Sequence, residues 1–426
     1  MDRASAKQVM GHRLPPLVER EIAKNVLHGK GFAPVAPDEE YHPVPVLELM
    51  GLLQRGKATG VVHGSWHLTD RGSSLRGKGC DKPRRNRIAI FCLVRSLLVI
   101  RFSSLGDVLF AIPAVRALLD SGQEPVSWLV EDRASDLPML VPGLHEVLVF
   151  PRRHPSEWFD HLSRLRERND QVIVDFQCNL KSRAHRLFLD AGEVYGFDHT
   201  VAKEGGEKGL TCQVQPSATQ THRIDQNLAL VKALGAPVPD VVPRPSLNLN
   251  QKTRDQATSW KESDPRPLVL LHPGTSAFGK LKRWSPSQFG GLGDLLVQQH
   301  QARIVITGGP GEEDIVRSTR HAMAEPHQAI QANSVEELGA LLEVADLVIA
   351  ADSFPLHLAN LLETPVVGLY GPKDPAVTGP YWDRAEVVRS EVSCSPCALR
   401  QCDDRICMDR LAIENVAEAA TRLLSP

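Results

Sequence analysis

Short apolar runs rich in β-branched residues recur along most of the chain, and each ends in a small or polar loop before a helical pattern. The first runs lie at residues 96–102, 126–130, 145–150 and 171–177. A second series lies at residues 268–274, 302–311, 345–353 and 364–372. Such runs predict strands buried on both faces, and their alternation with helices predicts doubly wound parallel sheets. We therefore expect an α/β protein with two successive Rossmann-like domains.

Glycines and prolines indicate where the helices and domains end. We expect helices over residues 108–122 and 222–235, each closing on a glycine, and further helices near residues 286–300 and at the end of the chain. Residues 236–267 contain six prolines and no strong period. This stretch is the predicted interdomain linker.

The first 95 residues differ in charge from the rest of the chain. They hold 16 basic and 9 acidic residues, whereas the remainder holds 33 basic and 42 acidic residues. With little sustained pattern, residues 1–95 are interpreted as a basic N-terminal extension, solvated or disordered, with two short amphipathic stretches. Two interpretations stay open: an arm that approaches an anionic membrane, and an extension from an over-long start assignment.

Global composition excludes several classes of protein. The net charge of -2 gives no support to a nucleic-acid-binding protein. Eight cysteines are too few and too uneven for a disulfide scaffold. The N-terminus lacks the apolar core of a signal peptide, and residues 88–100 are too short for a membrane-spanning helix. We expect a cytoplasmic protein, with peripheral contact at the inner face of the membrane left open.

The loop SSLGD follows the first predicted strand. Ser103 and Ser104 end the strand, Gly106 permits close backbone approach, and Asp107 opens the next helix. An Asp at this position caps a helix N-terminus through backbone N–H groups. A carboxylate at the mouth of a cleft is equally suited to act as a general base for a hydroxyl nucleophile. The spacing leaves both interpretations open.

Two loops of the second series have the residues for a phosphate or a ribose. HPGTSAFGKLKRW offers glycines and hydroxyls that would wrap an anion, with Lys280, Lys282 or Arg283 to neutralise it, although such lysines also simply face water. In GGPGEED, Glu312 and Glu313 would hold ribose hydroxyls or cap a helix. The loop is not a G-x-G-x-x-G fingerprint, so it does not support a nicotinamide cofactor.

The segment ADSFPLHLANLLETPVVGLYGP is the most informative one. Asp352 and Ser353 end a predicted strand, and His357 lies in the first turns of an apolar helix. A lone His on such a helix is usually a packed core residue. Together with Asp352, Ser353 and the following Gly-Pro loop, it lies where a diphosphate would bind.

Taken in order, these segments resemble the heptosyltransferase-like glycosyltransferases of family 9. LLVIRFSSLGDVLFAIPAVRAL, VIVDFQCNLKSR, HPGTS…KRW, ITGGPGEE and ADSFPLHLANLLETPVVGLYGPKDP carry the resemblance, which covers residues 96–426. It implies a GT-B fold, with an acceptor domain over residues 96–245 and a nucleotide-sugar domain over residues 246–426. It also implies inverting, metal-independent transfer of a heptose, typically from ADP-heptose to a lipopolysaccharide core or other lipid-linked glycan acceptor, without a cofactor.

The resemblance implies a role for each matching residue on the acceptor side and at the leaving group. Asp107 matches the proposed catalytic base, with Ser103, Ser104 and Gly106 around it on the acceptor side. One carboxylate is sufficient, because inversion needs a single displacement. Lys282 would offset the charge that grows on the leaving nucleoside diphosphate.

The remaining matches concern the donor. Thr275 and Ser276 correspond to residues that contact donor phosphates, and Glu312 or Glu313 corresponds to the ribose-binding acid. Asp352 corresponds to the acid that contacts the donor sugar. Ser353 and His357 flank the backbone amides expected to hold the diphosphate.

One position departs from the family. Members usually have Gly between the hydroxyl residue and the proline, where this chain has Phe354. Glycine permits positive φ or close approach to phosphate. We expect the phenylalanine to narrow the donor pocket or to alter the choice of donor; loss of activity is the third interpretation.

The C-terminal cysteines form a Cys-x2-Cys-x4-Cys-x4-Cys pattern, and such cysteine-rich tails recur in many family members. Their spacing suits structural Zn²⁺ or an iron–sulfur cluster, and it also suits a thiol-rich loop or a redox-labile disulfide. The residues are Cys394, Cys397, Cys402 and Cys407. None of these interpretations makes them catalytic.

Two other functions stay open at this point. A nucleotide-sugar epimerase of GT-B shape would need further acids in the cleft. A non-catalytic sugar-nucleotide-binding protein would have kept the fold without turnover.

Overall fold

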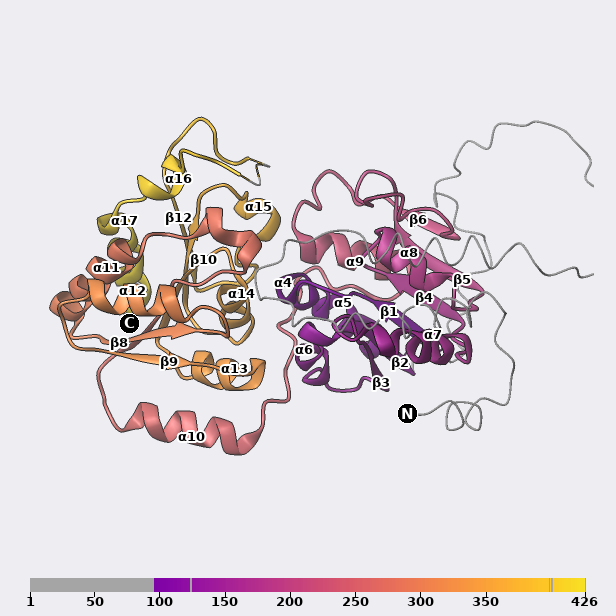
Figure 1. Cartoon of the computed structure of the whole chain (residues 1–426), viewed down its shortest axis with the longest axis horizontal. Helices are drawn as coiled ribbons and strands as arrows, with labels where there is room; N and C mark the ends of the chain where they lie inside the picture. The colour runs from indigo at the N-terminus through magenta and orange to yellow at the C-terminus, as the bar shows by residue number, and fades with distance from the viewer. Residues whose placement is uncertain (1–95, 123–124, 398, 400, 426) are drawn as a thin grey trace, which may run out of the picture. The chain divides into compact units, whose positions relative to one another are not determined.

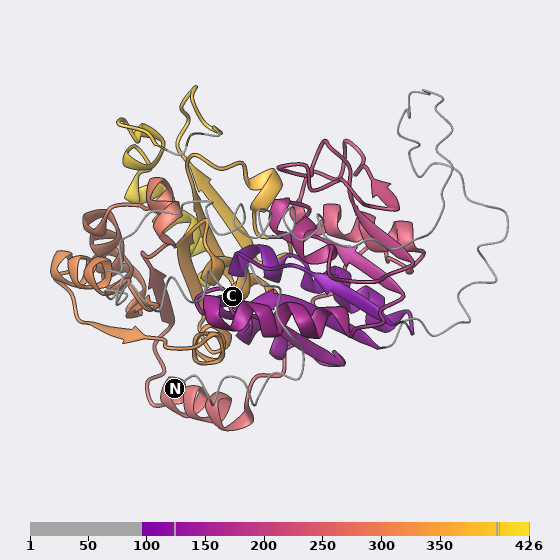
Figure 2. The same cartoon turned by 45° about the vertical axis from the view of Figure 1, so that its right-hand side comes forward.

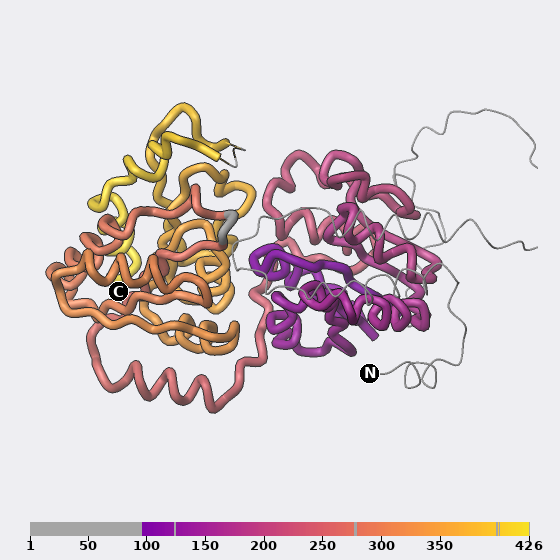
Figure 3. Tube along the Cα trace, in the orientation of Figure 1, coloured from indigo at the N-terminus to yellow at the C-terminus, as the bar shows by residue number. Residues whose placement is uncertain are grey.

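The computed structural model describes residues 96–122, 125–397, 399 and 401–425 (Figure 1). The basic N-terminal extension predicted for residues 1–95 lies outside the described residues. The described chain forms two six-stranded sheets, one after the other along the sequence. In Figure 3 the trace can be followed from the indigo and magenta segments of the first sheet to the orange and yellow segments of the second. The predicted doubly wound α/β class is confirmed.

The strands of the first sheet are all parallel, in the order β3-β2-β1-β4-β5-β6. β1 pairs with both β2 and β4, and all four of its side chains are buried. Burial on both faces is the reason for its unbroken apolar sequence. The bounds are β1 Leu97–Ile100, β2 Val126–Glu131, β3 Glu146–Phe150, β4 Val172–Asp175, β5 Glu193–Phe197 and β6 Cys212–Val214.

The second sheet repeats this winding, in the order β12-β11-β10-β7-β8-β9. Its strands are also parallel, and β7 occupies the place that β1 has in the first sheet, between β8 and β10. The bounds are β7 Leu268–His272, β8 Arg303–Gly308, β9 His327–Gln331, β10 Leu347–Ala351, β11 Val366–Tyr370 and β12 Ala385–Arg389.

Four strands, β5, β6, β9 and β12, have no counterpart among the predicted ones. Three of them lie at sheet edges, and β5 lies next to one. Edge strands face solvent on more sides and keep polar residues, as in the sequence HQAIQ of β9. They therefore lack the apolar run by which a central strand is recognised.

Helices cover both faces of the second sheet (Figures 1 and 2). Side chains alternate along β7: Val269 and Leu271 pack in one cluster with residues of α11 and α17, whereas Leu268 and Leu270 pack in the other with residues of α13 and α14. The helix bounds in this half are α10 Gln251–Glu262, α11 Pro286–His300, α12 Glu313–Ala322, α13 Val335–Glu343, α14 Phe354–Leu361, α15 Pro375–Thr378, α16 Ile406–Asp409 and α17 Ile413–Leu424, with the 3-10 helix η4 Ala277–Lys282.

The helices of the first half agree with the sequence pattern except at one break. The helix expected over residues 108–122 is divided into α4 and α5, because Pro113 in the first turn of α5 has no N–H to continue the hydrogen bonding of α4. α9 ends as predicted, at Gly235 with φ 100°. The bounds in this half are α4 Leu105–Leu109, α5 Ile112–Asp120, α6 Asp136–Met139, α7 Trp158–Arg166, α8 Leu180–Arg186 and α9 Arg223–Leu234.

The predicted linker contains a helix that the sequence pattern did not indicate. α10 has no buried residue, so its sequence lacks an apolar stripe. Its N-terminus is capped by Asn250, whose side chain accepts a hydrogen bond from the Lys252 N–H at 2.9 Å. Arg254 of α10 pairs with Glu343 of α13. The stretch predicted as the interdomain linker, residues 236–267, therefore contains a helix at residues 251–262.

The strand order places a ligand crevice in each half. In both sheets the order reverses beside the central strand, between β1 and β4 and between β7 and β10. Ligands of open α/β sheets bind at such a reversal, beyond the carboxyl ends of the strands. The loops that follow β1, β7 and β10 contain most of the residues predicted to form the site.

Candidate active site

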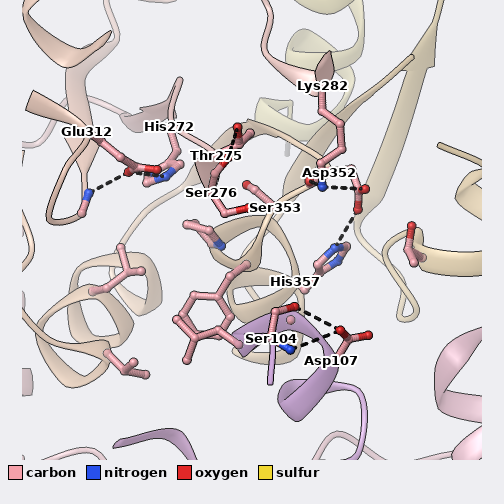
Figure 4. A pocket seen from close by; sticks show the side chains of 18 of the residues that line it. Ser104, Asp107, His272, Thr275, Ser276, Lys282, Glu312, Asp352, Ser353 and His357 are labelled. Atoms are coloured by element: carbon pink, nitrogen blue, oxygen red, sulfur yellow. Dashed lines mark hydrogen bonds and ion pairs between the residues drawn. The ribbon is translucent and has the colours of Figure 1, made fainter. Parts of the chain in front are cut away.

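A cavity of about 790 Å³ is lined by loops and helix N-termini from both halves of the chain (Figure 4). It brings together most of the predicted site residues, although they are far apart in the sequence. Those that line it are Ser104, Gly106, Asp107, Thr275, Ser276, Lys282, Glu312, Asp352, Ser353, Phe354 and His357. Ser103 and Glu313 are not among the lining residues.

Asp107 lies in the first turn of α4 and has two sets of partners. Its Oδ2 accepts hydrogen bonds from the Ser104 N–H at 3.3 Å and the Ser104 hydroxyl at 3.1 Å. Its Oδ1 lies 2.8 Å from the Arg101 guanidinium. The carboxylate therefore closes the helix N-terminus, as one of the two sequence interpretations expected, while 37% of the side chain stays exposed.

The electrostatics keep Asp107 ionised. Partial burial opposes ionisation, but Arg101, the Ser104 N–H and the more distant Arg223 together hold the pKa of the Asp107 carboxyl below its ordinary value. Gly106 adds space beside it, since a Cβ at that position would meet no atom within 4 Å. An ionised carboxylate next to open space can accept a proton from a bound hydroxyl group.

Lys282, Asp352 and His357 form a charged cluster on the other side of the cavity (Figure 4). The Lys282 ammonium lies 3.1 Å from Asp352 Oδ2, and His357 Nε2 lies 3.2 Å from Asp352 Oδ1. Burial alone would raise the pKa of the Asp352 carboxyl, but the His357 hydrogen bond and the Lys282 charge hold it well below its ordinary value. Lys282 is thus a cation held at the cavity wall by a fully ionised partner.

Thr275 is positioned by the residue that follows Lys282. The Arg283 guanidinium donates hydrogen bonds to the Thr275 hydroxyl at 2.9 Å and to the Thr275 carbonyl at 2.6 Å. Thr275 is buried and Ser276 is exposed, both after the end of β7. The loop therefore presents Thr275 from a fixed backbone, with Ser276 beside it on the cavity wall.

Glu312 and Glu313, which the sequence could not separate, have different environments. Glu312 lines the cavity, accepts a hydrogen bond from the Gly309 N–H at 2.8 Å and lies 3.3 Å from His272 Nε2. Burial opposes its ionisation, yet the His272 contact and the Gly309 N–H hold the pKa of Glu312 below its ordinary value. Glu313 is exposed and bonds to Gly311 and Gln331.

Gly274 makes this position of Glu312 possible. A Cβ at residue 274 would overlap the Glu312 carboxyl group. The glycine of the HPGTS segment is therefore required for close packing against an acidic side chain on the next loop.

The N-terminus of α14 faces the cavity with unpaired polar groups. Ser353 is the N-cap residue, but its hydroxyl makes no capping hydrogen bond, and its Oγ is buried without a partner in the described part of the chain. Phe354 follows at the first helical position, lines the cavity and packs partly against the core. The orphan N–H groups of a helix N-terminus, with an unpartnered hydroxyl beside them, suit an anionic ligand.

Several cavity residues were not found from the sequence. Arg133, Arg223, His272, Asn333 and Lys373 all line the cavity. His272 opens the HPGTS segment and Lys373 lies in GPKDP, but neither was named as a site residue, and Arg133 and Asn333 lie outside the quoted motifs. Arg223 did carry a signal, because it opens α9, where the helix dipole disfavours a cation. His272 also carried a signal, because it is the last residue of β7 and ligands of such sheets bind at the carboxyl ends of the strands.

The four C-terminal cysteines are free thiols that differ in exposure. Burial, and then the neighbouring thiols Cys394, Cys397 and Cys402, raise the pKa of the Cys407 thiol. Cys394 is exposed, Cys402 donates to the Asp404 carbonyl at 3.0 Å, and Cys407 is buried. Across the described ranges, no group of three or more His, Cys, Asp or Glu side chains is placed to hold a metal ion. The interpretation of these cysteines as zinc or iron–sulfur ligands stays a prediction.

None of the helices between residues 96 and 425 that the structure describes is both long and apolar enough to cross a membrane.

Comparison with protein families gives a match over more than half of the chain. Residues 158–406 match the family described as Glycosyltransferase family 9 (heptosyltransferase). Lipopolysaccharide heptosyltransferase 1 of Pseudomonas aeruginosa is 26% identical over 317 residues, which cover 71% of this chain and 85% of that protein. The protein of the same name from Escherichia coli (strain K12) is 24% identical over 310 residues, covering 69% and 93%.

Solved structures show the same fold. The glycosyl transferase family 9 structure from Veillonella parvula has a TM-score of 0.68 at 18% identity, covering 78% of this chain and 97% of that one. The E. coli heptosyltransferase WaaC with ADP has a TM-score of 0.62 at 21% identity, covering 77% and 99%. The GT-B fold expected from the sequence resemblance is confirmed.

Proposed function

The chain belongs to glycosyltransferase family 9, the heptosyltransferases, and on this premise we propose that it moves a heptose or related sugar from ADP-heptose to a lipopolysaccharide-core-type acceptor. The reaction would invert the anomeric centre and need no metal ion. Two similarities support the choice of substrates: the relatives named above are lipopolysaccharide heptosyltransferases, and the similar E. coli structure was solved with ADP.

One observation carries the proposal: an ionised carboxylate from the first half shares a cavity with the donor-type residues of the second half. Asp107 would accept the proton of the acceptor hydroxyl as that oxygen attacks the anomeric carbon. Residues 96–245 would hold the acceptor and residues 246–426 the donor. A single base on the acceptor side is what a one-step inversion needs.

The leaving nucleoside diphosphate would be stabilised by groups of the second half. Lys282 would exchange its contact with Asp352 for the diphosphate, and Thr275, Ser276 and the unpartnered Ser353 hydroxyl would donate hydrogen bonds to phosphate oxygens. His357 would stay on Asp352 and keep that carboxylate in place for the donor sugar.

The nucleoside and sugar ends of the donor would be selected by two further residues. Glu312 is the proposed acceptor of ribose hydroxyl groups, since it alone of the two glutamates lines the cavity. Phe354 would narrow the donor pocket beside the diphosphate and thereby limit the sugar that fits.

The acceptor would be lipid-linked, so we propose that the enzyme works in the cytoplasm at the inner face of the membrane. Co-sedimentation of the full chain with anionic vesicles tests this part, and an unchanged supernatant fraction would contradict it.

The central experiment compares two carboxylates of the same cavity. Asp107→Asn should lower turnover by about 10²–10⁴-fold, because the base is lost, while ADP binding measured by calorimetry stays within severalfold of wild type. Asp136 lines the same cavity from α6 and is the matched control. Equal losses in Asp107→Asn and Asp136→Asn would argue against a single base, and lack of transfer from ADP-heptose by the wild type would overturn the proposal.

A further inference from the structure

The cysteine-rich segment has no role in the reaction described so far. It is defined as residues 390–411 and contains α16 and the four cysteines; residues 398 and 400 lie outside the described part. Figure 1 shows α16 in the yellow C-terminal part of the chain, in the same half as the donor-type residues. Its hydrogen bonds reach two loops that line the cavity.

The first contact is made by Arg405, the residue before α16. Its guanidinium donates to the carbonyl oxygens of Lys280 at 3.4 Å and Arg283 at 3.3 Å. These carbonyls lie on both sides of Lys282. Arg283 in turn donates both of its side-chain hydrogen bonds to Thr275. Arg405 is therefore linked to Thr275 through Arg283. It also contacts the backbone carbonyl of Arg283, the residue next to Lys282.

The segment is also fixed to the start of α11. The Trp284 indole, fully buried, donates to the Leu411 carbonyl at 3.1 Å. The Gln288 amide donates to the carbonyls of Asp409 at 3.2 Å and Leu411 at 3.0 Å. Because these hydrogen bonds fix the backbone around α16, the Arg405 side chain is held in one position relative to the loop that it contacts.

The second contact is made at Gly371 and Pro372, which follow β11. The Ser395 hydroxyl donates to the Gly371 carbonyl at 2.5 Å, and the Cys397 N–H donates to the Pro372 carbonyl at 2.8 Å. A Cβ at Gly371 would overlap the Met408 sulfur and crowd the Cys407 sulfur. The Cys-Met step therefore packs directly against this loop, and the loop needs glycine there.

The second loop reaches the cavity immediately afterwards. Lys373 and Asp374 line it, and Asp374 caps α15 through the Ala376 N–H at 2.9 Å. One short segment is therefore bonded to the backbone of both loops, one with Thr275 and Lys282 and the other with Lys373.

We propose that the cysteine-rich segment is a brace for the donor side of the active site, with Arg405 as its main positioning residue. This inference rests on the proposed function. The brace holds the two loops at the spacing that the nucleoside diphosphate requires, so that donor affinity depends on the segment and acceptor affinity does not. A misplaced loop weakens binding even though no ligand contact is removed.

The test compares Arg405→Ala with Arg410→Ala. Arg410 is exposed, close in sequence, and its side chain has no partner within the described ranges, so the pair matches in charge and differs in contact. We expect Arg405→Ala to weaken ADP binding about tenfold in calorimetry, while Arg410→Ala stays within twofold. The donor KM should rise in parallel with an unchanged acceptor KM, and Arg405→Lys should recover part of the affinity.

Gly371→Ala disturbs the second contact of the brace, at the loop after β11. This variant keeps the inference testable if Arg405→Ala does not fold. It should also weaken ADP binding, because the new methyl group displaces Met408. ADP affinity equal to wild type in Gly371→Ala and in the folded Arg405 variants would overturn the brace while leaving the proposed function intact. A wild type that binds no ADP would instead overturn the proposed function, and the brace with it.

Discussion

The two halves have the same strand order but treat their buried charges and histidines differently. In the second half, His272 and His357 each lie within about 3.3 Å of a carboxylate, on Glu312 and Asp352. In the first half, His161 and His185 have Nε2 atoms that are buried without a partner in the described structure. Shared topology therefore fixes where a site forms, but it does not fix which buried histidines meet a carboxylate.

The carboxylates show the same contrast. Asp352 is held by one lysine and one histidine inside its own half, whereas Asp107 is influenced by two guanidinium groups, Arg101 and Arg223. The paired arrangement suits groups that exchange partners when a charged donor arrives. The cation-rich arrangement suits a base that must be ionised before the acceptor binds.

After the loss expected for Asp107→Asn, the largest effect should come from breaking the charged cluster of the second half. Lys282→Ala should lower kcat by about 10²–10³-fold, because charge on the leaving diphosphate loses its preorganised cation. Steady-state kinetics would measure this, with exposed Lys280→Ala as the control. Wild-type turnover should also persist in excess chelator; activity that returns only with a divalent ion would contradict the role given to Lys282.

Substitutions of the two adjacent glutamates can be compared directly, and we expect their effect on activity to be smaller than that of Lys282→Ala. Glu312→Gln should raise the donor KM about tenfold, because a buried charge-assisted acceptor is lost from the cavity. Glu313→Gln, on the exposed side of the same helix start, should change it less than twofold. Equal effects in a donor titration would show that position in the cavity does not decide the role.

The fall of kcat/KM at acid pH should depend on the cations around Asp107, because they lower the pKa of its carboxyl group. Because its pKa is lowered, the wild-type base stays ionised well below neutral pH, and kcat/KM falls only as pH drops through that lowered pKa. Arg101→Gln should raise the pKa of Asp107, so the fall in kcat/KM should begin at a higher pH than in the wild type. Arg223→Gln should shift it less, since Arg223 acts from a greater distance. An unshifted profile would mean that another group sets the acid limb.

The smallest effect on activity should come from His161 and His185, which influence stability instead. Burial lowers the pKa of His161 to about 4 and of His185 to about 3, against an ordinary value of 6.5. Both stay neutral in the folded state, so stability is complete above the ordinary pKa and is lost as pH falls below it. His161→Leu should reduce the loss of unfolding free energy between pH 7 and pH 5.5 by about 1 kcal/mol. Urea titrations would measure this, and exposed His145→Gln should show no such gain.

The central strands and the helices with clear end signals could be predicted, because apolar runs and capping residues mark them in the local sequence. β1 is an unbroken apolar run, and α11 has Ser285 as its cap with Pro286 as its first residue. α10 could not be predicted in this way, since none of its residues is buried and its Arg254 pairs with Glu343 of another helix. A local sequence pattern indicates which side chains are buried. It therefore misses an element that is held by contacts with residues distant in the sequence.

The site shows the same limit. Loops that follow central strands were informative because the topology carries them to one crevice, which is why Asp107, Thr275 and Asp352 meet. The difference between Glu312 and Glu313 depends on which side of a helix start faces His272, and no local pattern records that. Arg133 and Asn333 line the cavity from outside the segments that carry a motif.

The capping role of Asp107 has a consequence for repeated turnover. In the proposed reaction, a proton taken from the acceptor would neutralise the carboxylate and weaken both its Arg101 ion pair and its hydrogen bond from the Ser104 backbone. Because the same contacts favour the ionised carboxylate, they would also favour release of that proton to solvent through the exposed part of the side chain. The turn that caps α4 would thereby return the base to its starting state after each transfer.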